Sequence, residues 1–370
     1  FSAGTQPQLL FDATQISSWT NGTTTTWSNL GSAAASDATL RGDPQYNSTT
    51  KLFEFDGTDD HFELPDSTFD YSNGFAIHVF ANFGSVRDNW ERLVDFADSS
   101  AGGGGAPRYN VFFGRSGTSD QLVFRTFHGT EFGVEADCVA DGIVDDEYHL
   151  YSVVVSADGS ECTLYRNDIE LTTNYTTQGT DARPDQGGPV RTRDLAYIGK
   201  STFDADDDFE GDIQFVSMFN SPVIPAPSVT SLSTTSGAVA GGTATTLFGR
   251  YFSRATSLTI GDDTLSQQVD GTAAGGLAAG EWAYQTNGTI IAKTPQRTLA
   301  NRTAGAMQVV VTSAQGSSSD EVYFTYRPDF EDPGTSVVVL GELASRSEGK
   351  AVTRTTSTPY ETTGTDGRTG

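Results

Sequence analysis

The sequence predicts an all-β protein made of two sandwich domains and an extended C-terminal tail. Its 40 Gly, 23 Phe and 13 Tyr among 370 residues are typical of a turn-rich chain with aromatic strands. Short apolar–polar alternations recur at short intervals, and no long segment has helical periodicity. A chain of this length is too long for one small core, so we expect two or three domains.

The first domain is expected to be a series of strands separated by turns. Residues 52–57 and 59–64 form a strand, a tight acidic turn and a returning strand. Residues 75–83 alternate so strongly that two faces can be assigned: Phe75, Ile77, Val79 and Ala81 on one, Ala76, His78 and Phe80 on the other. Further strands are expected at 8–11, 25–30, 92–96, 109–113, 122–127, 150–155 and 163–166. Such close spacing is typical of a β-sandwich.

The end of this domain carries the most informative order of motifs. Strands, acidic turns and a closing strand follow one another at 147–155, 158–159, 162–165, 167–168, 196–199, 204–208, 209–213 and 219–220. This order resembles the last strands of a laminin-G-like domain of the concanavalin A-like jelly-roll superfamily. The resemblance covers nearly all of the first domain, residues 1–222. It implies an antiparallel jelly roll that recognises glycans or proteins more often than it catalyses a reaction.

Some relatives with this jelly roll are glycoside hydrolases, so catalysis has to be considered. Their carboxylates stand on one strand in a Glu-x-Asp-x-x-Glu or similar array, which places them about 5 Å apart for retaining chemistry. This chain has no such array; residues 135–137 and 145–147 come nearest, and both are expected in loops. The four His residues lack metal-ligand spacing, and no nucleophile elbow or phosphate loop is present. We therefore predict no catalytic residues and no enzymatic activity.

A calcium ion is the one cofactor that the resemblance implies, because laminin-G-like domains often hold Ca²⁺ at the rim of the sandwich. Calcium requires six to eight oxygen ligands, and Asp204, Asp206 and Asp208 in one loop are the candidate ligands. The loop lacks the Gly and the terminal Glu of an EF-hand. The alternative is a solvated acidic turn, and Asp59 and Asp60 are weaker candidates.

Two further kinds of site are expected in an exported protein. Cys138 and Cys162 fall in the first domain and are predicted to form a disulfide, with two isolated buried thiols as the alternative. Five Asn-x-Ser/Thr sequons are candidate glycosylation sites: Asn21, Asn47, Asn174, Asn287 and Asn301.

A stiff proline-rich linker at 221–227 introduces the second domain, which spans 223–327. Its Gly-rich turns and strands lie at 227, 229, 232, 236–237, 241–243, 245–249, 252, 294–295, 309–311 and 324–326. This pattern resembles an immunoglobulin-like IPT/TIG domain, which implies a spacer or a contact module. We expect Leu247, Val310 and Phe324 in its core and a protruding loop at 270–280.

Residues 328–370 form the predicted tail. It contains one apolar β segment at 336–340, and an orphan strand must pair because its backbone amides would otherwise lack partners. It would pack on the second domain or add to a sheet of a neighbouring subunit.

Charge narrows the possible partners. The 22 basic and 48 acidic residues give a net charge of −26, which disfavours nucleic acids and anionic membranes, and no apolar run is long enough to span a membrane.

These features together predict a non-enzymatic extracellular or cell-surface glycoprotein. It would serve adhesion, glycan or protein recognition, or assembly into a filament or appendage, with itself, surface proteins or glycans as partners. One alternative is a spike or fibre protein of a virion surface. The other is the carbohydrate-binding portion of a secreted polysaccharide-degrading enzyme.

Overall fold

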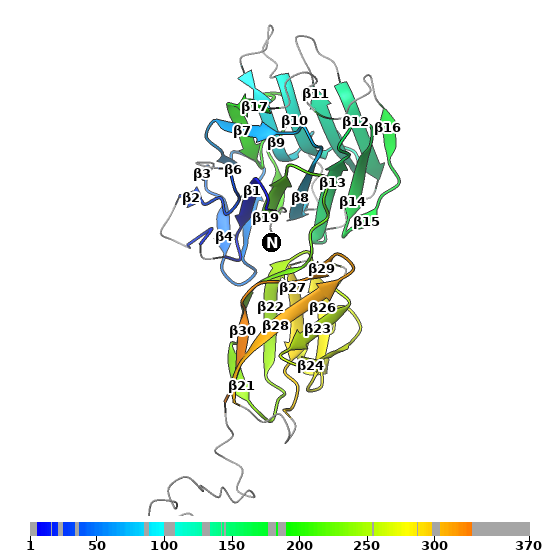
Figure 1. The fold of residues 1–370 in the computed structure, drawn as a ribbon. Helices are drawn as coiled ribbons and strands as arrows, with labels where there is room; N and C mark the ends of the chain where they lie inside the picture. Colours follow the sequence, from blue (N-terminus) through cyan, green and yellow to red (C-terminus); the bar gives the residue numbers. More distant parts are fainter. Residues whose placement is uncertain are drawn as a thin grey trace, which may run out of the picture.

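The structure, a computed structural model, shows two β domains, one stacked on the end of the other (Figure 1). It describes residues 6–15, 17–20, 25–33, 37–84, 89–99, 108–127, 134–141, 143, 146–176, 183, 190–253, 255–286, 288–297 and 304–327. The predicted tail, with its β segment at 336–340, lies outside the described residues.

Two large antiparallel sheets face each other in the first domain, as the jelly-roll resemblance implies. In the order of pairing, the eight-stranded sheet contains β15 (Ile169–Glu170), β14 (Cys162–Arg166), β13 (His149–Val155), β8 (Phe75–Asn82), β19 (Glu210–Phe219), β5 (Leu52–Asp56) and β4 (Gln45–Asn47), with β1 (Leu9–Asp12) also on β19. The nine-stranded sheet contains β16 (Asn174–Thr176), β12 (Val134–Asp141), β11 (Gln121–Phe127), β10 (Arg108–Arg115), β9 (Arg92–Asp98), β18 (Leu195–Ile198), β6 (His61–Glu63), β3 (Ala38–Arg41) and β2 (Thr26–Trp27). A small third sheet pairs β17 (Val190–Arg193) with β7 (Ser67–Asp70).

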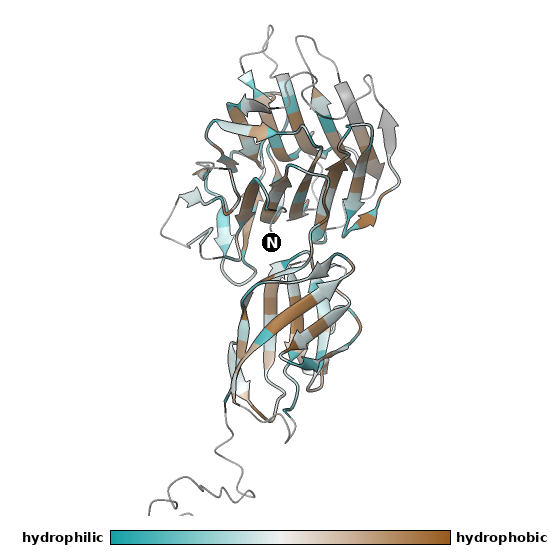
Figure 2. Cartoon of the chain, in the orientation of Figure 1, coloured by the Kyte–Doolittle hydropathy of each residue, from teal (hydrophilic) through white to brown (hydrophobic). Residues whose placement is uncertain are grey.

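Aromatic side chains fill the space between the two large sheets, where Figure 2 shows apolar residues along the strands. Trp27, Phe53 and Phe62 are fully buried, and their ring centroids lie 4.8 to 5.0 Å apart in tilted or edge-on pairs. Such pairs bury a large apolar area in a specific geometry. The abundance of Phe in the composition therefore reflects this core.

Every strand expected in the first domain is present, but one segment that was predicted to be a loop is a strand. Residues 135–137 lie within β12, where Asp137 is paired in register with Arg125 of β11. Their acidic side chains suggested a loop, yet alternation with small apolar residues is compatible with a strand. The short strands β3, β4 and β7 were also not anticipated.

All eight residues of β8 are buried, which explains why both of its faces are apolar. Phe75, Ile77 and Val79 lie in the core between the sheets, so the predicted division into two faces is confirmed. On the opposite face, His78 and Phe80 meet the second domain.

The second domain is a smaller sandwich, as the IPT/TIG resemblance implies. One sheet contains β20 (Ser228–Leu232), β22 (Ala244–Arg250), β27 (Thr289–Lys293), β26 (Glu281–Thr286) and β25 (Ser266–Gln267). The other contains β21 (Ser236–Ala238), β30 (Tyr323–Arg327), β28 (Gly305–Ser313), β23 (Ser257–Ile260) and β24 (Asp263–Thr264), with β29 (Gly316–Ser317) on β28.

The predicted core of this sandwich is correct for two of its three residues. Leu247 and Phe324 are fully buried. Val310 is only half-buried, because its neighbours Val309 and Val311 take the inward positions of β28. A strand has a side-chain period of two, so the prediction was one residue out of phase.

The expected protruding loop at 270–280 is mostly exposed but is fastened at one point. It contains the short 3-10 helix η2 (Ala274–Gly276), followed by Leu277, whose side chain is buried. Lys293 Nζ donates a hydrogen bond of 2.7 Å to the Leu277 carbonyl.

Buried polar contacts join the two domains. Arg250 of the second domain forms an ion pair with Asp12 of β1, and both side chains are almost fully buried. The Tyr251 hydroxyl lies 2.6 Å from Ser217 Oγ, and its ring packs with Phe80 and Phe215. These contacts hold the second domain against the outer face of the eight-stranded sheet.

His78 fastens the linker to the same face. Its Nε2 lies 2.9 Å from the Val223 carbonyl and therefore donates, so Nδ1 accepts from Ser152 Oγ at 2.8 Å. Burial lowers the pKa of His78 to about 4. The imidazole is thus neutral at pH 7 and holds the linker by a hydrogen bond.

Candidate functional site

The predicted calcium loop does not bring its three carboxylates together. Asp206 Oδ2 accepts hydrogen bonds of 2.7 Å from both Arg92 Nη2 and Ser201 Oγ, and Asp208 pairs with Lys200 Nζ at 3.1 Å. Asp204 is exposed. Because two of the three candidate ligands are neutralised by separate cations, this set does not fit a single Ca²⁺ ion.

The described residues contain a different acidic group, formed by Asp43, Asp59 and Asp60, whose ligand atoms lie within 4.8 Å of one another. Buried Asp60 accepts from the backbone N–H groups of Asp43 and Asp56, at 2.7 and 3.1 Å. These bonds account for both of its oxygens and stabilise the turn. The group, which includes the weaker candidates Asp59 and Asp60, thus has a structural explanation, and calcium stays a prediction.

A stack of aromatic and guanidinium groups lies on the outer face of the nine-stranded sheet. Arg92 and Phe112 are almost fully buried within it, whereas Trp90 and Arg125 are half-buried and reach the surface. The Arg92 guanidinium lies 3.7 Å from the ring centroid of Phe112 and 5.3 Å from that of Trp90. The Arg125 guanidinium lies 4.7 Å from the Trp90 ring. We call Trp90, Arg92, Phe112 and Arg125 the platform.

Trp90 is held in an unusual backbone conformation. Its φ of 60° is in the left-handed region, which a bulky side chain rarely adopts. Its amide donates to the Gly117 carbonyl at 3.2 Å, and its own carbonyl accepts from Arg92 Nη1 at 2.7 Å. Such strain is most often found at functional positions, where the surrounding structure maintains it.

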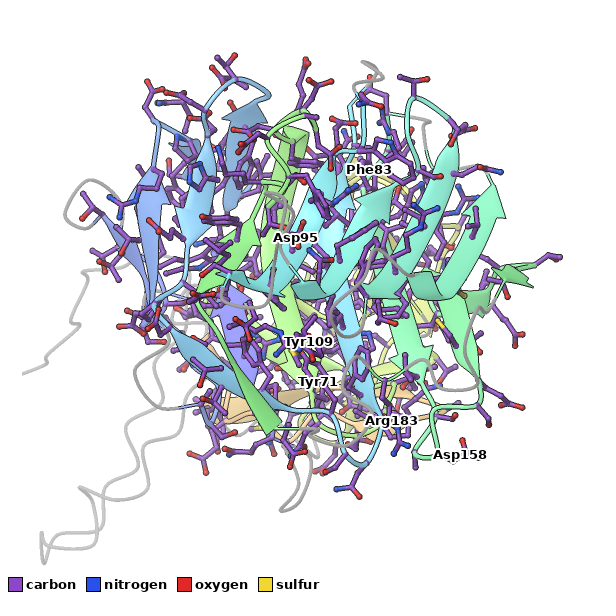
Figure 3. All side chains as sticks on the ribbon, turned by 90° about the horizontal axis from the view of Figure 1, so that it is seen from above. Tyr71, Phe83, Asp95, Tyr109, Asp158 and Arg183 are labelled. Atoms are coloured by element: carbon purple, nitrogen blue, oxygen red, sulfur yellow. The ribbon has the colours of Figure 1, made fainter. Side chains whose placement is uncertain are left out.

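Asp95 of β9, labelled in Figure 3, anchors the 199–208 loop through Thr202. Its Oδ2 accepts from the backbone N–H and Oγ1 of Thr202, at 3.0 and 3.1 Å, and its Oδ1 accepts from Asn110. Arg92 Nε is 3.7 Å away. Burial raises the pKa of Asp95 to about 6, because desolvation outweighs the stabilising effect of Arg92 and of these hydrogen bonds.

Among the described residues, two carboxylates in or beside the nine-stranded sheet are held in ion pairs. Glu91 pairs with Arg115 at 2.8 Å in full burial, and Glu63 pairs with Arg41 at 2.6 Å. Glu135 and Asp137 do share strand β12, but Ala140 stands where the third carboxylate of a glycosidase array would be.

The platform was not predicted from the sequence, although part of the signal was there. Phe112 lies between the inward-facing Val111 and Phe113, so alternation alone places it outward. Trp90 precedes its strand in a loop, and no periodic pattern marks it.

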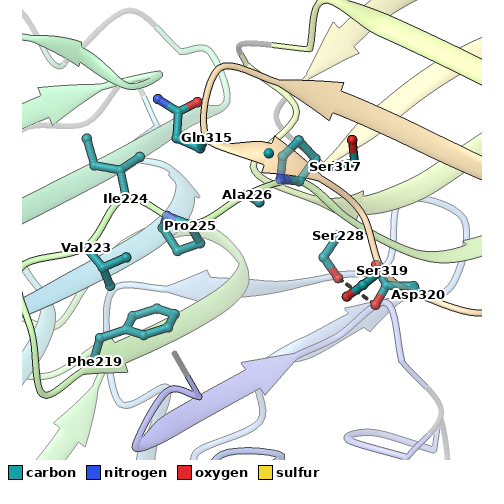
Figure 4. A pocket seen from close by; sticks show the side chains of 12 residues that line it. Phe219, Val223, Ile224, Pro225, Ala226, Ser228, Gln315, Ser317, Ser319 and Asp320 are labelled. Carbon is teal, nitrogen blue, oxygen red and sulfur yellow. Dashed lines mark hydrogen bonds between the residues drawn. The ribbon is translucent and has the colours of Figure 1, made fainter. Parts of the chain in front are cut away.

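Two clefts lie where the domains meet. The first, of about 370 Å³, is lined by the linker and by β29 (Figure 4), and Ser228 Oγ donates to Asp320 Oδ1 beside it at 3.2 Å. The second, of about 530 Å³, lies between the N-terminal strands and β20. We call the second the cleft.

The predicted disulfide is not formed in the structure. Cys138 and Cys162 are both buried thiols that are not joined by a disulfide, and Cys138 Sγ donates to the Cys162 carbonyl at 3.1 Å. The two residues lie on β12 and β14, strands of opposite sheets, but the thiol is satisfied by a backbone acceptor. The structure therefore has the alternative arrangement, two buried thiols.

The glycosylation sites stay predictions. Asn47 lies at the end of β4, where its Nδ2 donates to Glu54 Oε1 at 3.0 Å and its Oδ1 accepts from backbone N–H groups of the following turn. Asn174 begins β16. Asn21, Asn287 and Asn301 lie outside the described residues.

Comparisons with known structures return proteins from carbohydrate biology at low similarity. The CBM40 domain of Ruminococcus gnavus IT-sialidase bound to alpha2,3 sialyllactose is 10% identical with a TM-score of 0.33, over 44% of this chain and 91% of that one. Domain 4 of AbnA, a GH43 extracellular arabinanase from Geobacillus stearothermophilus, is 12% identical with a TM-score of 0.35, over 60% and 95%. Trypanosoma rangeli sialidase is 10% identical with a TM-score of 0.41, over 60% of this chain and 32% of that enzyme.

Comparisons at the sequence level give a clearer result. A search of curated protein sequences finds no match. Among the described residues, no helix is long and apolar enough to cross a membrane. Residues 56–226 match the concanavalin A-like lectin/glucanases superfamily, in its laminin-G form, and residues 227–326 match the IPT/TIG domain. The chain thus joins a laminin-G-like domain of the concanavalin A-like superfamily directly to an IPT/TIG domain.

Proposed function

We propose that this chain is a non-enzymatic extracellular recognition protein that binds glycans through the platform on its first domain. The second domain is packed firmly against the first domain and serves as a rigid support for it. The platform is the observation that carries the proposal. Sugars offer apolar C–H faces together with hydroxyl groups, and a half-buried indole beside guanidinium N–H donors suits both.

A binding role accounts for the electrostatics better than catalysis does. A general acid and base need carboxylates that are free to exchange protons with the substrate. Asp95, Glu63 and Glu91 are instead held by Arg92, Arg41 and Arg115. The matched superfamily includes lectins as well as glucanases, so a binding role is compatible with it.

An extracellular location agrees with the domain types, the high acidity and the sequons. Adhesion and assembly into larger structures would follow from the predicted tail, and they rest on the sequence alone.

A glycan array with the intact chain tests the proposal. We expect retention on a defined set of saccharides, and Trp90→Ala should lose about 30-fold in affinity, since a tryptophan at the centre of an interface contributes about 2 kcal/mol or more. Tyr323→Ala is the matched control, because Tyr323 is an exposed aromatic residue (44%) on β30 of the second domain. Retention on no saccharide, or equal retention of Trp90→Ala and the native chain, would refute the proposal.

A further inference from the structure

The cleft is built by residues from both domains. Trp19, Tyr46 and Lys51 come from the first domain, and Thr230 and Ser231 come from β20 of the second. Thr14 of the first domain joins the two walls, because its Oγ1 lies 2.8 Å from Thr230 Oγ1. Its volume of about 530 Å³ is in the range of small-molecule sites, which often lie between domains.

The lining combines aromatic rings with neutral hydroxyl and amide groups. The rings of Trp19 and Tyr46 lie 6.0 Å apart at one end. Of the described residues that line the cleft, Lys51 is the only one with a charge, and its Nζ lies over the Phe248 ring at 5.2 Å. A chain with a net charge of −26 repels acidic ligands at long range. This chemistry suits an uncharged molecule with many hydroxyl groups.

The nearest buried carboxylate does not change that conclusion. Asp12 lies behind the cleft, where it is neutralised by Arg250 and accepts from Thr14 Oγ1 at 2.6 Å and from Gln15 Nε2 at 3.2 Å. Its charge fixes the side chains that line the cleft and is not presented to a ligand.

Two polar atoms of the lining lack a partner among the described residues. The indole Nε1 of Trp19, a side chain that is 7% exposed, makes no hydrogen bond, and neither does Ser231 Oγ. Buried polar groups are nearly always hydrogen-bonded, since leaving one unsatisfied costs about 1–3 kcal/mol. Both residues line the cleft, so a ligand seated there is a candidate partner for these two buried atoms.

We propose that the cleft is a second glycan subsite, specific for neutral oligosaccharides and shared by the two domains. The inference takes its ligand class from the proposed function, but it concerns a separate place in the molecule. A sugar ring packs against the Trp19 and Tyr46 edge, and its hydroxyl groups bond to Ser231 and to the hydroxyl-bearing side chains around it. The buried junction keeps the two walls at a fixed distance, so little ordering is required on binding.

Site-resolved fluorine NMR on the intact chain tests the inference. The four Trp residues are labelled with 5-fluorotryptophan, and Trp19→Phe and Trp90→Phe assign the two relevant signals. Cellotriose, maltotriose and arabinotriose are titrated to millimolar concentration as probes. We expect at least one of them to shift the Trp19 signal saturably.

Substitutions with matched controls locate the effect. Ser17→Trp places a large side chain in the cleft from an exposed position and should abolish the ligand-induced shift of the Trp19 signal. The matched control is Ser266→Trp, at an exposed position on β25 outside the cleft, which should leave that shift unchanged. Ser231→Ala should weaken binding about fivefold, the equivalent of one hydrogen bond.

The outcomes separate the two proposals. A shift of the Trp90 signal alone would overturn the cleft inference and leave the platform as the glycan site. A Trp19 shift that persists in Ser17→Trp would also overturn it. If no probe shifts the Trp19 signal, the cleft does not bind neutral oligosaccharides, and the array then decides the proposed function on its own.

Discussion

The platform and the domain junction hold their charges in different ways. On the platform, Arg92 is paired with Asp95 and Asp206, all within the first domain. At the junction, Arg250 and Asp12 come from different domains and lie 238 positions apart in the chain. The platform is therefore complete in one domain, whereas the cleft beside the junction exists only when the two domains are docked.

This difference changes the role of the second domain. An Ig-like module between recognition domains is usually regarded as a spacer. Here Tyr251 is buried against the outer face of the eight-stranded sheet, and β20 supplies one wall of the cleft. The IPT/TIG domain is thus a structural part of the unit that we propose for recognition.

The largest effect is expected from breaking the junction ion pair. Arg250→Leu leaves Asp12 buried without its cation, which should lower the free energy of unfolding by about 3–5 kcal/mol. Chemical denaturation measures this loss of stability. Adding Asp12→Asn to the Arg250→Leu chain should restore a large part of it. If Arg250→Leu alone had native stability, the domains would not be held together by this ion pair.

The next largest effect is a pH dependence that arises at the junction. The pKa of His78 is lowered to about 4 from 6.5, so between these values the unfolded chain binds a proton that the native chain does not. Its contribution to stability is present above pH 6.5 and is lost as the pH falls toward 4, by about 3 kcal/mol. Denaturation at pH 7 and pH 4.5 should show a smaller difference for His78→Gln than for the native chain. Identical differences would contradict a buried neutral imidazole.

The platform should respond to pH in the opposite direction. The pKa of Asp95 is raised to about 6 from 3.8, so between these values the native chain binds the extra proton. Its contribution is present below pH 3.8 and is lost as the pH rises through 6, again by about 3 kcal/mol. Asp95→Asn, which mimics the neutral carboxyl group, should therefore be less sensitive to a rise from pH 4 to pH 7. An Asp95→Asn variant that loses as much stability as the native chain over this interval would show that the pKa of Asp95 is not raised.

The smallest effect concerns the unpaired hydroxyl group in the cleft. Ser231→Ala removes a buried oxygen without a partner among the described residues, so stability should stay the same or rise by up to about 1 kcal/mol. Thermal unfolding without ligand measures this. A clear loss of stability would mean that Ser231 has a structural role.

Most of the fold could be predicted from the sequence, because each core strand carries its own alternation. β8 is the best example, where the pattern identified both faces. Two predictions about the strands were wrong. At β12 the acidic residues suggested a loop, and at Val310 the inward-facing positions were shifted by one residue. Neither of the two proposed binding regions could be predicted, since Trp90 stands in a loop and the cleft unites Trp19 with Ser231, which are distant in sequence.

A crystal structure of the intact chain with the saccharide selected by the array tests the central claim most directly. We predict a sugar ring against Trp90, with its hydroxyl groups within hydrogen-bond distance of the Arg125 guanidinium. A saccharide bound elsewhere on the molecule, with the platform uncovered, would contradict the assignment of the platform as the glycan-binding surface.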